Sequence, residues 1–256
     1  MEVEVLQKTE SPERLVCQAA RGDYSADYIG DIEFGELMKD SKFDDRDVQG
    51  GVYREDGDYK SYDHPSILDA KVKAFIERQL SRGHYGPWEH PSITFAVSGV
   101  SRVTMAQITR HRHMSFDVQS MRYVDFREQE VVTPRSLTDD DHFTREGGET
   151  EIPELRDARM MYENAAQEMV NAYLELVEDN NVPKEDARYI LPLGMSVNMT
   201  FSGNARSFMH LFNLRQKASS QWEIRELSGM LATELKEWMP HSFSWYEQNR
   251  PHKIGP

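Results

Sequence analysis

Short strand-like segments separated by long helical ones constrain the fold more than any other feature of this 256-residue sequence. Alternating or apolar β-type patterns predict strands at Met1–Leu6, Ile93–Val100 and Met195–Phe201. Helical spacing of apolar residues predicts helices at Ser66–Leu80, from Val103 toward His111, at Pro153–Glu178, at Asn204–Gln216 and at Gln221–Met239, the last stopped by Pro240. Few strands in irregular alternation with helices indicate an α+β fold, a small and mostly antiparallel sheet flanked by long helices.

The chain is expected to form one domain over residues 1–256, because neither half looks self-sufficient. Two polar, acidic, glycine-containing stretches, residues 41–63 and 137–151, are predicted to be surface loop insertions. No run of 18 apolar residues exists, so no membrane span is expected, and the N-terminus lacks the basic-then-apolar layout of a signal peptide. A cytoplasmic location follows as a prediction.

Charge excludes some partners and suggests a source. Acidic residues number 44 and basic residues 30, a formal net charge of −14, which disfavours general binding to nucleic acid or anionic membranes. Only ten of the 30 basic residues are lysine, and high acid with low lysine predicts a halophilic source. The single cysteine, Cys17, fits a reducing compartment and is the one residue that any thiol-nucleophile mechanism would have to use.

A dense basic cluster, residues 110–122, stands out in this acidic chain. It holds three arginines, two histidines and two serines. Arginine forks bind phosphate in a bidentate manner and serine hydroxyls add donors, so the cluster favours an anion-binding site. A solvated basic turn, or a helix end whose arginines pair with carboxylates, is an equally good interpretation of the composition alone.

Other segments carry weaker signals. The Gly83–His90 loop is suited to stacking on a planar ligand, or is simply a packed loop with an exposed histidine. Arg215 lies at the edge of an apolar helical stripe, where it needs an anionic partner, either Glu223 or a ligand. Arg188 is a further candidate of the same kind. A metal site built from His111, His113, His84 and His90 is disfavoured, because Arg110 and Arg112 flank the first pair.

Common nucleotide motifs are absent. The sequence contains no G-x-G-x-x-G fingerprint, no Walker phosphate loop, no G-x-S-x-G elbow and no H-E-x-x-H pair. Any nucleotide site in this chain is therefore of a less common type.

Arg110-His111-Arg112, followed after seven residues by Ser120, resembles the R-H-R-x7-S signature of flavin-dependent thymidylate synthases. The similarity covers roughly residues 15–243, and further matching groups follow in family order and spacing: Gly83-His84, Glu89-His90, Gln107, Arg122-Tyr123, Arg188, Leu191-Pro192-Leu193, Asn204-Ala205-Arg206-Ser207, Asn213-Leu214-Arg215 and Gln221-Trp222-Glu223-Ile224. The resemblance implies reductive methylation of dUMP, with 5,10-methylenetetrahydrofolate as carbon donor, NADPH as reductant and FAD as hydride carrier. It also implies a homotetramer with sites at subunit interfaces and no cysteine nucleophile.

The resemblance also implies roles for individual residues. Arg215 is expected to be catalytic, as a fixed cation that stabilises charge developing on the uracil ring. Ser120 is expected to position a ligand, since no adjacent general base is evident. The implied flavin-binding residues are His84, Gly86, Arg110, His111, Arg112, Asn204, Arg206 and His210. The implied dUMP-binding residues are Gln107, Arg110, Gln119, Ser120, Met121, Arg122, Arg188 and Arg215, and no metal ligand is implied.

Three positions depart from the family pattern. Val118 stands where glutamate or glutamine is usual, with Gln119 next to it, so one ligand contact is lost or shifted by a residue. Asp117 replaces a small polar residue, and Ser219 stands where histidine is common. Two other classes of function stay open from the residues: a metal-dependent nucleotide hydrolase using the histidines, and a non-catalytic binding protein built on the arginine patch.

Overall fold

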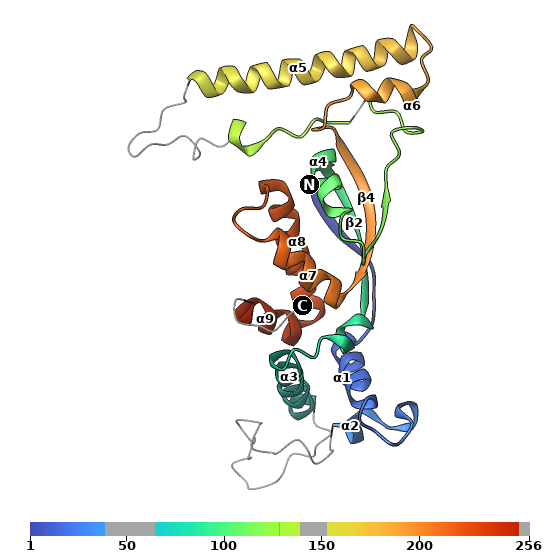
Figure 1. The fold of residues 1–256 in the computed structure, drawn as a ribbon, viewed down its shortest axis with the longest axis vertical. Helices are drawn as coiled ribbons and strands as arrows, with labels where there is room; N and C mark the ends of the chain where they lie inside the picture. The colour runs from blue at the N-terminus through green and yellow to red at the C-terminus, as the bar shows by residue number, and fades with distance from the viewer. Residues whose placement is uncertain (39–64, 128, 139–152, 251–256) are drawn as a thin grey trace. The chain divides into compact units, whose positions relative to one another are not determined.

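The computed structural model describes residues 1–38, 65–127, 129–138 and 153–250. Its elements run along the chain in an irregular α+β order (Figure 1). They are β1 (Glu2–Lys8), α1 (Pro12–Gly22), α2 (Phe34–Leu37), α3 (Pro65–Ser81), β2 (Ser92–Ser101), α4 (Arg102–Ile108), β3 (Ser115–Val118), α5 (Pro153–Glu178), α6 (Lys184–Ala187), β4 (Ser196–Asn204), α7 (Ala205–Arg215), α8 (Trp222–Trp238) and α9 (Pro240–Asn249), with short 3-10 helices between them.

The four strands form one small sheet in the order β1-β2-β4-β3. Contacts between β1 and β2 show that this pair is antiparallel. Thr9 N donates to Ser92 O at one end of the β1–β2 pair, while the Ser98 hydroxyl donates to the Glu2 carboxylate near the other. The predicted α+β class and antiparallel sheet are therefore confirmed, whereas the extent of the domain stays a prediction.

The chain divides into two compact units, each built from three separate segments. Unit 1 comprises residues 1–4, 95–201 and 221–227, and unit 2 comprises residues 5–94, 202–220 and 228–256. Aromatic side chains contribute to the core of each unit. Phe201 packs against Phe95 and Phe116 in unit 1, with ring centroids 5.9 and 5.7 Å away, and Phe243 packs against Phe212 and Tyr246 in unit 2.

Most predicted elements appear with small shifts in their bounds. The helix predicted over Pro153–Glu178 is α5, and those expected at Ser66–Leu80 and Asn204–Gln216 are α3 and α7. The helix expected from Val103 ends at Ile108 and does not reach His111. The two predicted loop insertions fall almost wholly outside the described residues.

Pro240 was expected to stop a helix, but it also begins one. Helix α8 does end at Trp238, and α9 then starts with Pro240 in its first turn. Proline suits this position because its missing N–H needs no partner there and its fixed φ matches the helix. Helix α1 was not predicted, although Pro12 likewise occupies its first turn.

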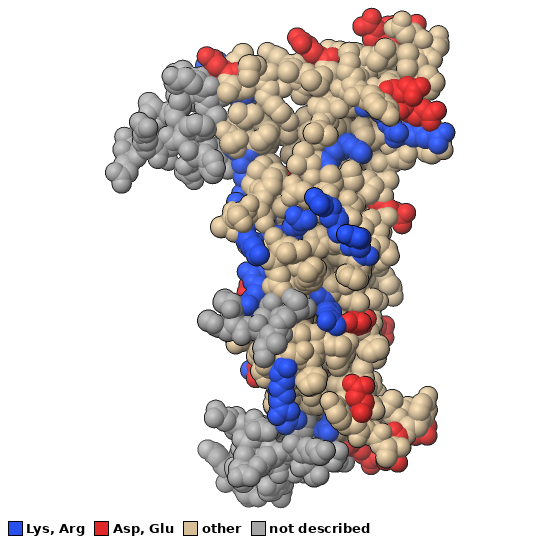
Figure 2. Space-filling view, viewed as in Figure 1, with Lys and Arg blue, Asp and Glu red and all other residues tan. Residues whose placement is uncertain are grey.

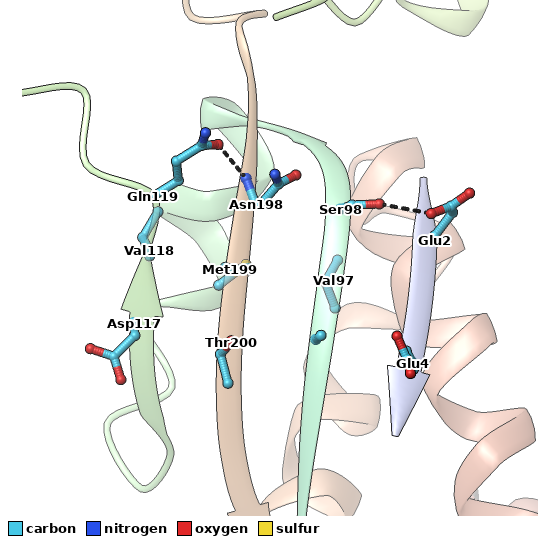
Figure 3. A pocket seen from close by; sticks show the side chains of 11 residues that line it. Glu2, Glu4, Val97, Ser98, Asp117, Val118, Gln119, Asn198, Met199 and Thr200 are labelled. Atoms are coloured by element: carbon cyan, nitrogen blue, oxygen red, sulfur yellow. Dashed lines mark hydrogen bonds between the residues drawn. The ribbon is translucent and has the colours of Figure 1, made fainter. Parts of the chain in front are cut away.

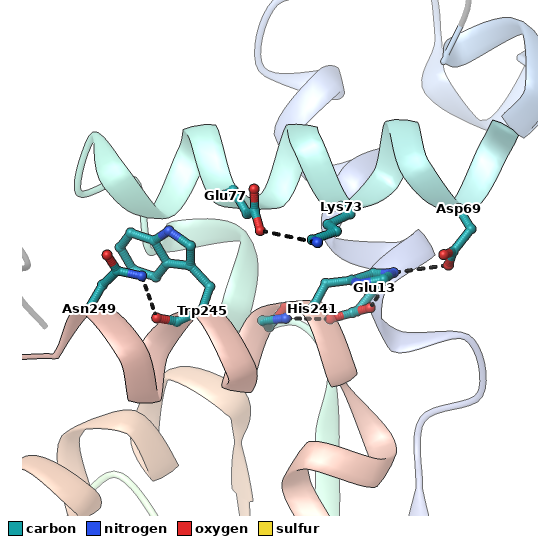
Figure 4. A network of polar contacts seen from close by, with 8 residues as sticks. Glu13, Asp69, Lys73, Glu77, His241, Trp245 and Asn249 are labelled. Carbon is teal, nitrogen blue, oxygen red and sulfur yellow. Dashed lines mark hydrogen bonds and ion pairs between the residues drawn. The ribbon is translucent and has the colours of Figure 1, made fainter. Parts of the chain in front are cut away.

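A buried carboxylate and a histidine together join three helices of unit 2 (Figure 4). Glu13 of α1 accepts a hydrogen bond from Ser242 N at 2.7 Å, at the start of α9. His241 Nε2 lies 2.9 Å from Asp69 Oδ1 of α3 and 3.9 Å from Glu13 Oε2. Burial raises the pKa of Glu13 above its ordinary value, while Ser242 N and His241 favour its charged form. The contacts hold the start of α9 against α1 and α3.

Candidate functional site

The Arg110-His111-Arg112 triplet follows directly after helix α4. Ser101 caps this helix by accepting a hydrogen bond from Thr104 N at 3.2 Å. At the other end, His111 N bonds to Ile108 O and Met114 N bonds to His111 O, each at 3.1 Å. These turns bury His111, which is 6% exposed, and leave Arg110 and Arg112 at the surface. The middle residue therefore anchors the turn and the two arginines face outward.

Arg110 and Arg112 have no side-chain ion pair or hydrogen bond within the described part of the chain. That is informative in a protein whose acidic residues outnumber its basic ones, because surface arginines there have many carboxylates available. Basic side chains appear at several places on the face drawn in Figure 2 despite this excess. Two exposed guanidinium groups that bind no anion among the described residues have donors to offer a ligand.

The segment after β3 is tied to the sheet (Figure 3). Gln119 N donates to Asn198 O at 2.8 Å, and the Gln119 side-chain carbonyl accepts from Asn198 N at 3.1 Å. The Gln119 carbonyl therefore serves the sheet, and its amide group is what a ligand can use. Ser120 Oγ accepts a hydrogen bond from Arg122 N at 3.3 Å, and no base bonds to it among the described residues. Met121 is buried, so we expect its predicted ligand contact to be made by its backbone.

A groove of about 490 Å³ lies on this sheet, but its chemistry does not suit a nucleotide phosphate. Its lining includes Glu2, Glu4 and Asp117, and no lysine or arginine occurs among its lining residues (Figure 3). Carboxylates repel a phosphate, so the phosphate site is to be sought among the arginines instead. Asp117, one of the departures from the family pattern, lies in this groove.

Glu185 of α6 draws two predicted substrate residues together in unit 1. Arg122 forms an ion pair with the Glu185 carboxylate, and Arg188 Nε donates to the Glu185 carbonyl at 2.9 Å. The Arg122 guanidinium also lies over the Tyr123 ring, 5.3 Å from its centroid. Two of the arginines expected around dUMP are thus oriented by a shared glutamate.

Arg102 is a further cation that sequence reasoning missed. Burial and the charge of Arg188 lower the pKa of Arg102, so the two arginines lie near enough to repel each other. A signal for it exists in the sequence, because Arg102 stands in the first turn of a helix, where the helix dipole disfavours a cation. Arg102 and Arg188 together with the start of α4 therefore form a positive region, which favours an anion.

The predicted residues of unit 2 gather on two of its segments. His84 lies in the turn before the 3-10 helix Gly86–Glu89, and Gly86 is the first residue of that helix. His84 is exposed, and a Cβ on Gly86 would meet no atom of the described residues within 4 Å. On α7, Asn204 caps the helix by accepting from Ser207 N at 2.8 Å, and Arg206 forms an ion pair with Glu89. The Arg206–Glu89 pair joins these two segments, and Glu89 was not predicted as a site residue.

His210 and Arg215 also belong to α7. His210 is exposed and Arg215 half-buried, as its place at the edge of the apolar stripe predicts. Glu223 is the carboxylate that the sequence offers as a partner for Arg215. It is buried in unit 1, where it accepts hydrogen bonds from Ser101 N, at 2.6 Å, and from the Ser101 hydroxyl. Arg215 itself falls in unit 2.

The predicted site thus falls into two sets. Unit 1 carries the residues of the signature segment and its neighbours: Gln107, Arg110, His111, Arg112, Gln119, Ser120, Met121, Arg122 and Arg188. Unit 2 carries His84, Gly86, Asn204, Arg206, His210 and Arg215. Whether the two sets meet around common ligands stays a prediction.

Cys17 is unsuited to act as a nucleophile. Its side chain is fully buried in α1, and burial together with the charge of Glu13 raises its pKa far above the ordinary value for a thiol. A thiol that keeps its proton is a poor nucleophile. In the described part of the chain, no group of three or more His, Cys, Asp or Glu side chains has the arrangement of a metal site, and no helix is long and apolar enough to cross a membrane.

We therefore expect Cys17→Ala to leave turnover within about twofold of the wild type. The truncation removes a few buried atoms and is expected to cost about 1 kcal/mol of stability, as small core truncations do. Turnover is to be measured at a temperature where both proteins are folded, as judged by circular dichroism. A loss of turnover by orders of magnitude in a folded variant would contradict the assignment of Cys17 as a core residue.

Fold and site together define an α+β protein with an exposed arginine pair suited to anionic ligands. The family described as "Thymidylate synthase complementing protein" matches residues 4–241, and the chain belongs to this family. It is 40% identical to the flavin-dependent thymidylate synthase of Halobacterium salinarum, over 99% of this chain and 98% of that protein. It is also 40% identical to the one from Haloarcula marismortui, with both chains fully covered, and both sources agree with the predicted halophilic origin.

A solved structure shares the fold at lower identity. The UMP/dUMP methylase PolB from Streptomyces cacaoi, crystallised with 5-Br dUMP, superposes with a TM-score of 0.70 at 20% identity. The match covers 96% of this chain and 94% of that one. This likeness shows that the α+β arrangement is shared along nearly the whole chain.

Proposed function

We propose that the chain is a flavin-dependent thymidylate synthase that methylates dUMP to dTMP, with 5,10-methylenetetrahydrofolate as the carbon donor, NADPH as the reductant and FAD as the cofactor. Membership of the family and the 40% identity to named enzymes of this type support the reaction. The single structural observation that carries it is the exposed Arg110 and Arg112 pair, which holds no protein anion in the described part of the chain.

The residues present suit FAD. Arg110 and Arg112 offer guanidinium donors to a pyrophosphate, and Gly86 leaves its surroundings open near exposed His84, where a Cβ would meet no described atom within 4 Å. From α7, Arg206 and His210 add further donors, while the side-chain carbonyl of Asn204 is engaged in capping and leaves its amide group for a ligand. When bound, FAD supplies hydride transfer to the reaction.

The dUMP site is proposed around the arginines of unit 1. Arg122 and Arg188, oriented by Glu185, would hold the phosphate together with Ser120, and Gln107 and the Met121 backbone would contact the nucleoside. Arg215 would act on the ring. A fixed guanidinium beside the uracil lowers the energy of negative charge that develops on it, which makes C5 nucleophilic without an enzyme thiol.

We also propose that the protein works as a homotetramer in the cytoplasm, with its sites at subunit interfaces.

Absorption spectroscopy tests the function. The purified protein is expected to be yellow, with flavin absorbance, and its chemically reduced form should be oxidised on adding dUMP and methylenetetrahydrofolate together. Omitting dUMP is the control, and it should leave the reduced flavin spectrum in the absence of oxygen. A colourless protein that fails to bind added FAD would exclude this function, and a metal requirement would favour a hydrolase instead.

A further inference from the structure

A second cavity, separate from the groove on the sheet, lies within unit 2. It has a volume of about 600 Å³ and lies between the C-terminal parts of α1 and α3 and beside α2. Three arginines line it, Arg21 from α1, Arg78 from α3 and Arg82 just beyond α3, together with His84. Three guanidinium groups in one cavity of an acidic protein suggest an anionic ligand.

Helix dipoles explain only part of this cluster. A helix C-terminus favours a nearby cation, which accounts for Arg21 at the end of α1 and for Arg78 in the last turn of α3. It does not account for a second guanidinium, Arg82, at the same end of α3. The Arg82 side chain is exposed and makes no hydrogen bond or ion pair within the described residues. His84, also exposed, likewise has no side-chain partner among them.

The charge and lining of the cavity narrow the class of ligand. Asp27 and Glu36 also line it, so three arginines against two carboxylates leave a formal excess of one positive charge. A ligand with a few carboxylates suits this balance better than a dinucleotide with several phosphate charges. Tyr24, which is 74% exposed, and Leu37 add aromatic and apolar surface beside the arginines. A carboxylate tail joined to an aromatic ring matches such a lining.

We propose that this cavity binds the carboxylate tail of the folate co-substrate. The inference rests on the proposed thymidylate synthase function, which requires a folate, and it assigns residues to that ligand. Arg82 would take a tail carboxylate at the mouth of the cavity, with Arg78 and Arg21 deeper. His84, which lies in the same cavity and is also a predicted flavin residue, would mark the end nearer the reacting groups.

The test compares ligand binding by Arg82→Ala with that by Lys73→Ala. Lys73 is an exposed lysine on α3, does not line the cavity and, among the described residues, pairs only with Glu77, at 4.0 Å. Titration calorimetry of the FAD-loaded protein at fixed salt would use three probes: tetrahydrofolate with its glutamate, tetrahydropterin without a tail, and NADP⁺. Arg82→Ala is expected to weaken tetrahydrofolate binding about tenfold or more, as for a lost charge-assisted hydrogen bond. Tetrahydropterin and NADP⁺ should bind as in the wild type.

Three results would overturn the proposal. Equal tetrahydrofolate affinities for Arg82→Ala and wild type would place the tail elsewhere, and a selective loss of NADP⁺ binding would assign the cavity to the reductant. An equal loss of tetrahydrofolate affinity in Lys73→Ala would mean that the effect comes from the net charge of the protein and not from a contact with Arg82. Arg82→Lys, which keeps the charge but not the fork, should fall between wild type and Arg82→Ala. Wild-type protein that binds no tetrahydrofolate at all would instead contradict the proposed function, so the two failures are distinguishable.

Discussion

Replacing Arg215 with alanine is expected to lower turnover about a hundredfold or more while the protein stays folded. Removing one preorganised donor that stabilises transition-state charge costs that much in enzymes where it has been measured. Arg215 is half-buried at the C-terminal end of α7, where the helix dipole favours its charge, so its position is set before any ligand arrives. The loss should therefore appear in kcat far more than in the KM for dUMP.

Single-turnover oxidation of reduced flavin in the presence of dUMP and methylenetetrahydrofolate measures this effect directly. Lys217→Ala is the matched control. Lys217 is exposed and lies two residues after Arg215, so its replacement removes one positive charge from the same region. Arg215→Lys keeps the charge but loses the planar fork, and an intermediate rate is expected. Wild-type turnover in Arg215→Ala would refute the catalytic role.

Replacing Arg110 with alanine is expected to weaken FAD binding by about tenfold to a hundredfold, with a smaller effect on turnover of the saturated enzyme. Hydrogen bonds to charged groups contribute about 1.5–3 kcal/mol each, which corresponds to this range. Little reorganisation is expected in the free protein, because the Arg110 side chain is exposed and no carboxylate in the described part of the chain depends on it.

Flavin absorbance during titration of the apoprotein measures the affinity. Arg159→Ala serves as the control, since Arg159 is also exposed and belongs to unit 1, but it pairs with Glu163 on α5. The salt dependence is informative as well, because an arginine that contacts phosphate should make affinity fall with rising salt. Unchanged FAD affinity in Arg110→Ala would show that Arg110 of the signature motif does not bind the cofactor.

Local patterns predicted much of the fold. The bounds of α5 follow from Pro153 and an uninterrupted helical spacing, and β2 and β4 follow from short apolar runs, because periodicity depends on neighbours along the chain. Local patterns did not predict that Pro240 begins α9. A proline that follows the end of one helix and a proline that begins another look alike in sequence. Strand β3, inside the basic cluster, was missed because its pairing partner β4 is distant in the chain.

The candidate site divides in the same way. Residue types and spacing alone singled out Arg110, Arg112, Arg188 and Arg215, because guanidinium groups in an acidic chain indicate an anionic ligand. They did not reveal that Gln119 and Asn204 already serve the backbone, or that Glu185 orients two arginines. These facts depend on hydrogen bonds between residues that are remote in sequence or on the capping state of a helix end.

The sequence by itself determined the chemistry available to this protein: a family signature, a single cysteine and a set of arginines for phosphates. Only the tertiary structure decided which of those groups are still available to ligands. It buried His111 and Cys17, left Arg110 and Arg112 without described partners, and brought Arg21, Arg78 and Arg82 to one cavity. The physical reason is that burial, pairing and shared cavities arise from contacts across long sequence separations, which local spacing does not encode.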